Sequence, residues 1–229
     1  MSMKEKDHNT GDNLQTIEET LGRTERYIEE NRKSLMIIIA AIIVIVGGYM
    51  GYRKFFQQPK ELEAQQQMFT AERYFEKDSF KLALKGDGSY PGLLDIIDEY
   101  GSTKSGKLAY YYTGVCYLRN GDYDNAIKYL KDYSGGDKII ASMAIGALGD
   151  AYLEKGDKKE ALDYYLKAAK QNENDFTTPY FLMKVGMVYE ITGEKQKALE
   201  TYQVVKDKFY KSTEGRKAEK YIAKLEAQM

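Results

Sequence analysis

The stretch IGALGDAYLEKGDKKEALDYY, residues 145–165, occurs three times in related form. Its counterparts are YYYTGVCYLRNGDYDNAIKYL at 110–130 and LMKVGMVYEITGEKQKALETY at 182–202, and the copies align without gaps at spacings of 35 and 37 residues. Self-similarity at this spacing is typical of an array of stacked supersecondary units. The shared residues are Gly114, Gly149 and Gly186; Tyr117, Tyr152 and Tyr189; Gly121, Gly156 and Gly193; Ala126, Ala161 and Ala198; Ile127, Leu162 and Leu199.

Each shared position has a physical role in a pair of packed helices. The first glycine lets a neighbouring helix approach, the tyrosine fills the space between helices, and the second glycine suits the left-handed residue that ends a helix. The acidic residues Asp122, Asp157 and Glu194 follow that glycine, and the helix dipole favours them at the start of the second helix. In the third copy, Thr178-Pro179 predicts the N-cap and first residue of a helix.

The pattern resembles the tetratricopeptide repeat, a helix-turn-helix unit of about 34 residues. The family pattern has Leu before the first glycine; Leu148 fits and Thr113 departs. The resemblance predicts an all-α fold in which the units stack into a solenoid. The expected domain covers 60–229, with a degenerate unit at 60–101, repeats at about 107–140, 142–175 and 179–212, and a capping helix at 213–227.

The degenerate unit is expected to place Tyr74 at the tyrosine position and to use 92–100 as its second helix, after a connecting loop at 86–92, GDGSYPG. Two further stretches resemble each other: EYGSTKSGKLA at 99–109 and FYKSTEGRKAE at 209–219. Both predict the exit from one helix followed by the cap of the next.

An apolar segment, SLMIIIAAIIVIVGGYMGYRK at 34–54, precedes the repeats. Its 18 residues from Leu35 to Tyr52 carry no charge, and a helix of that length spans about 27 Å, close to the hydrocarbon thickness of a bilayer. A cleaved signal would have a shorter preceding region and a small-residue cleavage site, and a buried core helix would show polar residues at helical spacing. The segment predicts a single transmembrane signal-anchor helix.

Basic residues are more frequent before this segment than after it, with six up to Lys33 and three from Arg53 to Lys60. This bias favours a cytoplasmic N-terminus, although the reverse topology stays open. One face of the span carries Ala40, Val44, Gly47 and Gly51, a spacing that permits close helix packing or simple exposure to lipid.

Two segments precede the span. Composition predicts a disordered polar tail at 1–13. Residues 14–33 predict an amphipathic juxtamembrane helix that contacts a partner or lies on the membrane; its apolar stripe is Leu14, Ile17, Leu21 and Ile28.

Composition excludes several function classes. The net charge of −1 provides no field to gather nucleic acid. One cysteine, Cys116, and one histidine, His8, cannot form a disulfide or a cysteine-based zinc site, and Cys116 is expected to fill the core. Without a plausible nucleophile and base we expect no enzyme, no metal, no cofactor and no small-molecule substrate.

Binding of other proteins remains, and the tetratricopeptide resemblance places it on the first helices of the units. Methionine and tyrosine there predict an adaptable apolar groove, although several of these side chains could instead pack beneath neighbouring helices. The lysine and asparagine clamp with which some tetratricopeptide domains bind a carboxylate is absent at these positions. The expected groove positions are Leu108, Tyr111, Val115, Leu118, Arg119, Met143, Gly146, Asp150, Leu153, Glu154, Tyr180, Met183, Met187, Glu190 and Ile191.

The whole arrangement is similar to the YfgM family of ancillary SecYEG translocon subunits, through the lead-in LGRTERYIEENRK, the span and the block LLDIIDEYGSTKSGKLAYYYTGVCYL. That resemblance implies a single-pass protein of the bacterial inner membrane with its repeats in the periplasm. It further implies that the repeats assist exported polypeptides together with a PpiD-like chaperone. The alternative is a scaffold subunit of another envelope secretion or assembly complex.

Overall fold

The computed structural model describes residues 26–228, a part of the chain that contains helices and no strand. By internal contacts the chain divides into two compact units, Met1–Gln58 and Pro59–Met229. The predicted tail at 1–13 and residues 14–25 of the predicted juxtamembrane helix lie outside the described residues. The all-α fold class is confirmed.

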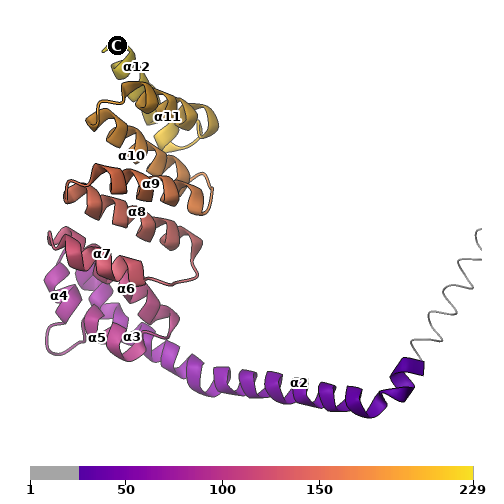
Figure 1. The fold of residues 1–229 in the computed structure, drawn as a ribbon. Coiled ribbons are helices and arrows are strands. Elements are labelled where there is room, and N and C mark those ends of the chain that lie inside the picture. The colour runs from indigo at the N-terminus through magenta and orange to yellow at the C-terminus, as the bar shows by residue number, and fades with distance from the viewer. Residues whose placement is uncertain (1–25, 229) are drawn as a thin grey trace, which may run out of the picture. The chain divides into compact units, whose positions relative to one another are not determined.

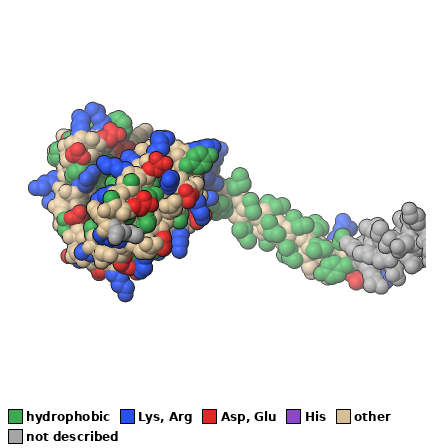
Figure 2. Space-filling view, turned by 90° about the horizontal axis from the view of Figure 1, so that it is seen from above, with side chains coloured by type: hydrophobic (Ala, Val, Ile, Leu, Met, Phe, Trp, Pro, Cys, Tyr) green, Lys and Arg blue, Asp and Glu red, His purple; other side chains and the backbone are tan. Residues whose placement is uncertain are grey.

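The first unit contains helix α2, Arg32–Tyr52, and the π-helical turn η1, Arg53–Gln57. No residue of α2 is buried, and Figure 2 shows its hydrophobic side chains exposed along the helix. The helical run Arg32–Glu76, which begins with α2, includes a window of mean hydropathy 2.4 and is long and apolar enough to cross a membrane. This conclusion rests on length and composition. A helix that is apolar on every side suits a lipid environment better than water.

The second unit is built from short helices that follow one another in antiparallel pairs, and from α6 onward they stack into a solenoid (Figure 1). Its hydrophobic core consists of successive clusters between neighbouring helices, as expected when each unit packs mainly on the next. The helices are α3, Gln58–Glu76; α4, Phe80–Lys85; α5, Leu93–Tyr100; α6, Lys104–Arg119; α7, Tyr123–Asp132; α8, Lys138–Glu154; α9, Lys158–Gln171; α10, Thr177–Ile191; α11, Lys195–Lys208; and α12, Thr213–Glu226.

The first repeated glycine permits the two helices of a pair to touch. A Cβ atom on Gly149 would lie 2.6 Å from the ring of Tyr165, and one on Gly186 would lie 2.3 Å from the ring of Tyr202. In the first repeat, Gly114 faces Leu130 in the same way. The predicted close approach is confirmed, and in two repeats its partner is an aromatic ring with almost no exposed surface.

The predicted turn chemistry holds at most positions. The second glycines adopt φ between 78° and 85°, the left-handed region in which glycine has no Cβ penalty. Asp122 and Asp157 then accept hydrogen bonds from the backbone N–H groups three residues later, so both are N-caps. Glu194 occupies the same position without a capping bond.

The N-cap predicted at Thr178 is wrong. Helix α10 begins at Thr177, and Asn174 Oδ1 accepts from the backbone N–H groups of Phe176 and Thr177, both at 2.8 Å. The Thr178 hydroxyl instead donates to the carbonyl of Ala169 at 3.0 Å. Thr178 therefore ties α10 back to the end of α9 instead of capping its own helix.

The two similar stretches around 99–109 and 209–219 adopt the same structure. Thr103 Oγ1 donates to the carbonyl of Tyr100 and accepts from the N–H of Gly106, at 2.7 and 2.9 Å. Ser212 makes the same pair of bonds with Phe209 and Gly215, also at 2.7 and 2.9 Å. The predicted helix exit followed by a helix cap is confirmed in both places.

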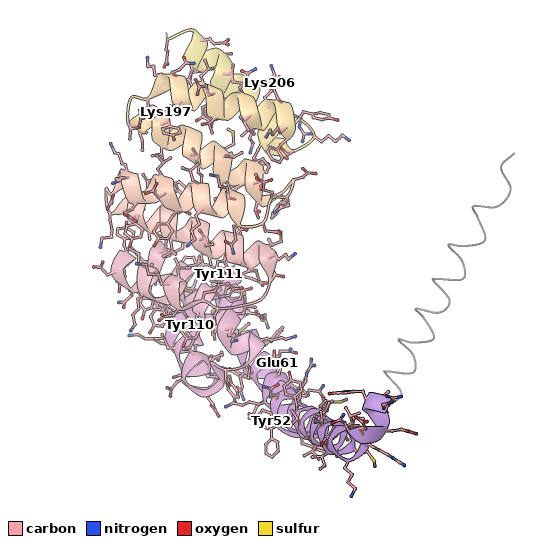
Figure 3. The ribbon with its side chains drawn as sticks, turned by 45° about the vertical axis from the view of Figure 1, so that its right-hand side comes forward. Tyr52, Glu61, Tyr110, Tyr111, Lys197 and Lys206 are labelled. Atoms are coloured by element: carbon pink, nitrogen blue, oxygen red, sulfur yellow. The ribbon has the colours of Figure 1, made fainter. Side chains whose placement is uncertain are left out.

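The segment before the first repeat contains one more helix than predicted, because α4 forms between Tyr74 and the loop at 86–92. The hydroxyl of Tyr74 donates to Asp87 in that loop at 2.6 Å. Near the start of the unit, Glu61 on α3 (Figure 3) accepts from the backbone N–H of Lys104 at 2.6 Å and from the hydroxyl of Ser105 at 2.7 Å. Glu61 thus binds the start of α6, where the helix dipole favours a negative charge.

The glycine contact predicts a packing defect in Gly149→Ala. The added methyl group must displace the Tyr165 ring, so we expect the free energy of unfolding to fall by about 2 kcal/mol and Tm by roughly 4–8 °C. Circular dichroism melts of the detergent-solubilised chain measure this. Gly136→Ala is the matched control, since a Cβ there meets nothing within 4 Å; equal melting of the two variants would contradict the packing argument.

The Glu61 contact predicts a pH-dependent contribution to stability. Burial raises the pKa of Glu61, but hydrogen bonds from Ser105, Gln65 and the backbone outweigh it and hold that pKa below its usual range. The stabilisation is therefore present above the unperturbed pKa of about 4.3 and is lost as pH falls through the folded-state value. Glu61→Gln should lower Tm at pH 7, by an amount that shrinks below about pH 4.

Glu219→Gln, at an exposed position on α12, provides the control for that experiment. A Tm difference for Glu61→Gln that stays constant from pH 7 to pH 3 would show that the carboxylate charge is irrelevant to the contact.

Candidate functional site

Two adjoining cavities lie along the first helices of the repeats. We call them the tyrosine compartment, of about 570 Å³, and the methionine compartment, of about 220 Å³. They share the side chains of Leu153, Tyr165, Tyr180 and Lys184. The tyrosine compartment is also lined by Tyr111, Val115, Leu118, Arg119, Tyr123, Met143, Ala147, Asp150, Glu154 and Phe181, and the methionine compartment by Met183, Met187, Glu214, Lys217 and Tyr221.

The structure brings together most of the groove residues predicted from the sequence. Helices α6, α8 and α10 supply them to the tyrosine compartment, as Figure 3 shows for Tyr111 on α6. Met183 and Met187 line the other compartment, with α12 as its far wall. The predicted residues found in the tyrosine compartment are Tyr111, Val115, Leu118, Arg119, Met143, Asp150, Leu153, Glu154 and Tyr180.

Four of the predicted groove residues line neither compartment. Leu108 packs against the core cluster that α6 forms with the helices before it. Gly146 lies beneath the ring of Phe181, which a Cβ would meet at 1.9 Å. Glu190 accepts hydrogen bonds from two neighbouring side chains, and Ile191 is exposed at the end of α10.

The tyrosine compartment is more polar than the predicted apolar groove. Asp150 Oδ1 accepts from the hydroxyl of Tyr165 at 2.6 Å and from Lys184 Nζ at 2.7 Å. Tyr123 also reaches Glu154, at 3.5 Å. The expectation of an adaptable apolar surface applies only to the methionine compartment, where Met187 is 48% exposed.

Lys184 and Tyr165 are the important residues that the sequence analysis missed. Tyr165 lies on the second helix of its repeat, α9, although the prediction considered only first helices. The available signal for Lys184 is its spacing, since it follows Asp150 by 34 residues, close to one repeat. Residues one repeat apart lie on adjacent first helices and can meet across them.

Tyr165, Asp150 and Lys184 form a set of tyrosine, acid and lysine, and a set of the same kind occurs a second time. The hydroxyl of Tyr202 donates to Glu190 Oε1 at 2.7 Å, and Lys224 Nζ lies 2.8 Å from Glu190 Oε2. Lys224 also follows its acidic partner by 34 residues. Each set joins the second helix of a repeat, its first helix and the first helix of the following unit, so each stabilises both the pair and the stack.

Burial and nearby charges raise the pKa of two tyrosine hydroxyl groups in the groove. Burial, then the charge and hydrogen bond of Asp150, raise the pKa of Tyr165. Burial, with neighbouring tyrosines and Asp150, raises the pKa of Tyr111 to about 12. At neutral pH these hydroxyls are therefore hydrogen-bond donors.

Cys116 is fully buried, and burial raises the pKa of its thiol to about 12. A thiol with that pKa is a poor nucleophile at neutral pH, so the predicted role as a core residue is confirmed. Within residues 26–228, no group of three or more His, Cys, Asp and Glu side chains is placed to hold a metal ion.

Two family models describing the tetratricopeptide repeat match the chain, at residues 108–134 and 143–175. The matched residues cover most of α6 with all of α7, and most of α8 with all of α9. They support the assignment of these helices as tetratricopeptide repeats. Such arrays expose extended surfaces that can bind other proteins, and tetratricopeptide repeats imply a protein-interaction role of this kind.

Two curated proteins are similar in sequence to this chain, and the name of one of them refers to TPR repeats. The chain is 29% identical over 117 residues to the TPR repeat-containing protein MJ1428 of Methanocaldococcus jannaschii, and 25% identical over 154 residues to human Superkiller complex protein 3. These matches cover 51% and 67% of the chain but only 20% and 9% of the relatives.

Two crystal structures of nearly identical TPR-like repeats from a Podosopora anserina kinesin light chain are similar in fold. Their TM-scores are 0.55 and 0.54 at 17% and 16% identity. The similarity covers 74% and 71% of this chain and 87% and 85% of those chains. At this level of identity the match shows the solenoid fold alone.

The ion pair between Asp150 and Lys184 predicts a measurable coupling in stability. Both side chains are partly buried, at 31% and 24% exposure, so a double-mutant cycle with Asp150→Asn and Lys184→Met should give about 1 kcal/mol. Urea unfolding of the four proteins in detergent measures it. The control cycle uses Lys155 and Asp124, an ion pair whose acid is 85% exposed; coupling there should be smaller, and equal coupling would contradict the argument from burial.

Proposed function

We propose that this protein is a membrane-anchored tetratricopeptide repeat protein that binds polypeptides in the groove formed by α6, α8, α10 and α12. The observation that supports this most directly is the pair of adjoining compartments, lined by tyrosines, methionines and charged groups from consecutive first helices. The lining mixes exposed apolar surface with hydroxyl donors, a combination common in sites that bind protein segments.

The span is proposed to determine which polypeptides the groove meets. Anchoring raises the effective concentration of the groove near the membrane, so weak contacts become sufficient. The resemblance to the YfgM family favours the SecYEG translocon as the neighbour and exported polypeptides as the ligands, with a PpiD-like chaperone nearby. On this proposal the protein is an accessory subunit, neither an enzyme nor a nucleic-acid-binding protein, and it needs no small-molecule substrate.

The proposed location is the inner membrane, with the N-terminus in the cytoplasm and the repeats in the periplasm. The greater number of basic residues before the span supports this orientation. Tyr49 and Tyr52, both exposed on α2, suit the membrane interface that follows.

The face of the span that carries Ala40, Val44, Gly47 and Gly51 is a candidate contact for translocon helices. A Cβ on Gly47 or Gly51 meets nothing within 4 Å, so a partner helix could approach closely there.

Affinity purification in mild detergent after in vivo crosslinking tests this proposal. We expect translocon subunits and exported chains to co-purify, and Met187→Glu to reduce crosslinking to exported chains by about tenfold, because it places a charge in an apolar site. Met183 is unsuitable for this test, since it is 8% exposed and packs in the cluster with Tyr202; a charge there would unfold the array.

Ile191→Glu is the matched control, because Ile191 is exposed on the same helix but lines neither compartment. Purification of a different envelope complex at full stoichiometry would favour the scaffold function instead. Unchanged crosslinking in Met187→Glu would remove the groove from the proposal.

A further inference from the structure

Lys184 stands between the two compartments and contributes to the lining of both. Its ammonium group lies 2.7 Å from Asp150 Oδ1 and 5.4 Å from the ring centroids of both Tyr165 and Tyr180. A carboxylate and two aromatic faces thus hold one cation from three sides. Lys184 is fixed in a way that an exposed lysine is not.

Lys217 differs from Lys184 in that no acidic side chain among the described residues holds it in place. It also lines the methionine compartment but is exposed, and within residues 26–228 it forms no ion pair. Its long side chain keeps its rotamer freedom, so it can move away from an incoming ligand. Lys184 cannot do so without breaking its contact with Asp150.

The tyrosine compartment has unused hydrogen-bond donors. The side chains of Tyr111, Tyr180 and Arg119 donate no hydrogen bond to another residue in the described part of the chain. Donors that lack a partner in the free protein are complementary to acceptor oxygens, and the main-chain carbonyls of an extended polypeptide offer them in a row. A helical ligand has already used those carbonyls internally.

The methionine compartment has the opposite chemistry. Leu153, Met183, Met187 and Tyr221 are among its lining residues, and a flexible thioether such as that of the exposed Met187 accommodates large apolar side chains of different shapes. A ligand that occupies both compartments therefore needs an apolar side chain on one side of Lys184 and polar or main-chain groups on the other.

We infer that Lys184 is the specificity-determining residue of the groove: it divides the site, so that the groove selects extended segments with an apolar half and a polar half. This inference rests on the proposed function, because it describes how the same groove chooses among polypeptides. Segments that are apolar throughout are disfavoured, since their second half would desolvate the charges of Lys184 and Asp150 without replacing their hydrogen bonds.

Two fluorescein-labelled nine-residue peptides test the inference on the full-length protein in nanodiscs. A split peptide carries leucines in one half and serine and asparagine in the other, whereas an all-leucine peptide carries leucines in both; both have the same polar tail. Fluorescence anisotropy gives the ratio of the two dissociation constants. Lys184→Met, which keeps the stem and removes the charge, should shift that ratio at least about fivefold toward the all-leucine peptide.

Lys220→Met removes the same charge from an exposed position of α12 that lines neither compartment and should leave the ratio within about twofold of the wild-type value. An equal shift in both variants would overturn the inference, because lysine charge would then act without dividing the site. Failure of the wild-type protein to bind either peptide would also overturn it, whereas the proposed function would still be judged by which proteins co-purify. Circular dichroism of each variant establishes that the array is folded.

Discussion

The contact of a large side chain with a glycine Cα is the constraint on which the repeat array depends. In the second and third repeats the large side chain is a tyrosine, Tyr165 on Gly149 and Tyr202 on Gly186. The missing Cβ lets the ring approach the first helix closely, and the phenolic hydroxyl donates to an acidic residue of that helix. The acid in turn holds a lysine from the next unit. Helix pairing, stacking of the repeats and the position of Lys184 in the groove thus follow from one absent methyl group per repeat.

Repeat spacing and turn chemistry were predictable from the sequence because they depend on residues close together in the chain. The left-handed glycines, the aspartate N-caps and the two caps at Thr103 and Ser212 each involve residues a few positions apart. The apolar span is equally local, since it requires only length and the absence of charge. The N-cap of α10 was mispredicted for the converse reason. Thr178 bonds to the preceding helix, and Asn174, outside the pattern considered, accepts from the N–H groups at the start of α10.

The candidate site was predictable only in part, because its character depends on contacts between repeats. Which first-helix positions face the groove could be inferred from the family pattern, and most of those residues do line it. Whether a given position is open or covered depends on what the next unit places above it: Phe181 covers Gly146, and Lys224 engages Glu190. The polar character of the tyrosine compartment arises in the same way, through a tyrosine from a second helix and a lysine 34 residues away. The contact of Glu61 with α6 joins residues 43 positions apart. It does not belong to the repeat pattern, so the sequence did not predict it.

In both ion pairs the lysine follows the acid by 34 residues: Lys184 follows Asp150, and Lys224 follows Glu190. Helix α10 of the third repeat carries both a lysine and an acid of these ion pairs, so it is joined to α8 through Lys184 and to α12 through Glu190. A duplicate of the third repeat would therefore bring with it both the acid and the lysine from which a further junction of this kind is made. Such a duplication would lengthen the groove, and hence the segment that it can hold, while Lys184 and its contacts stay as they are.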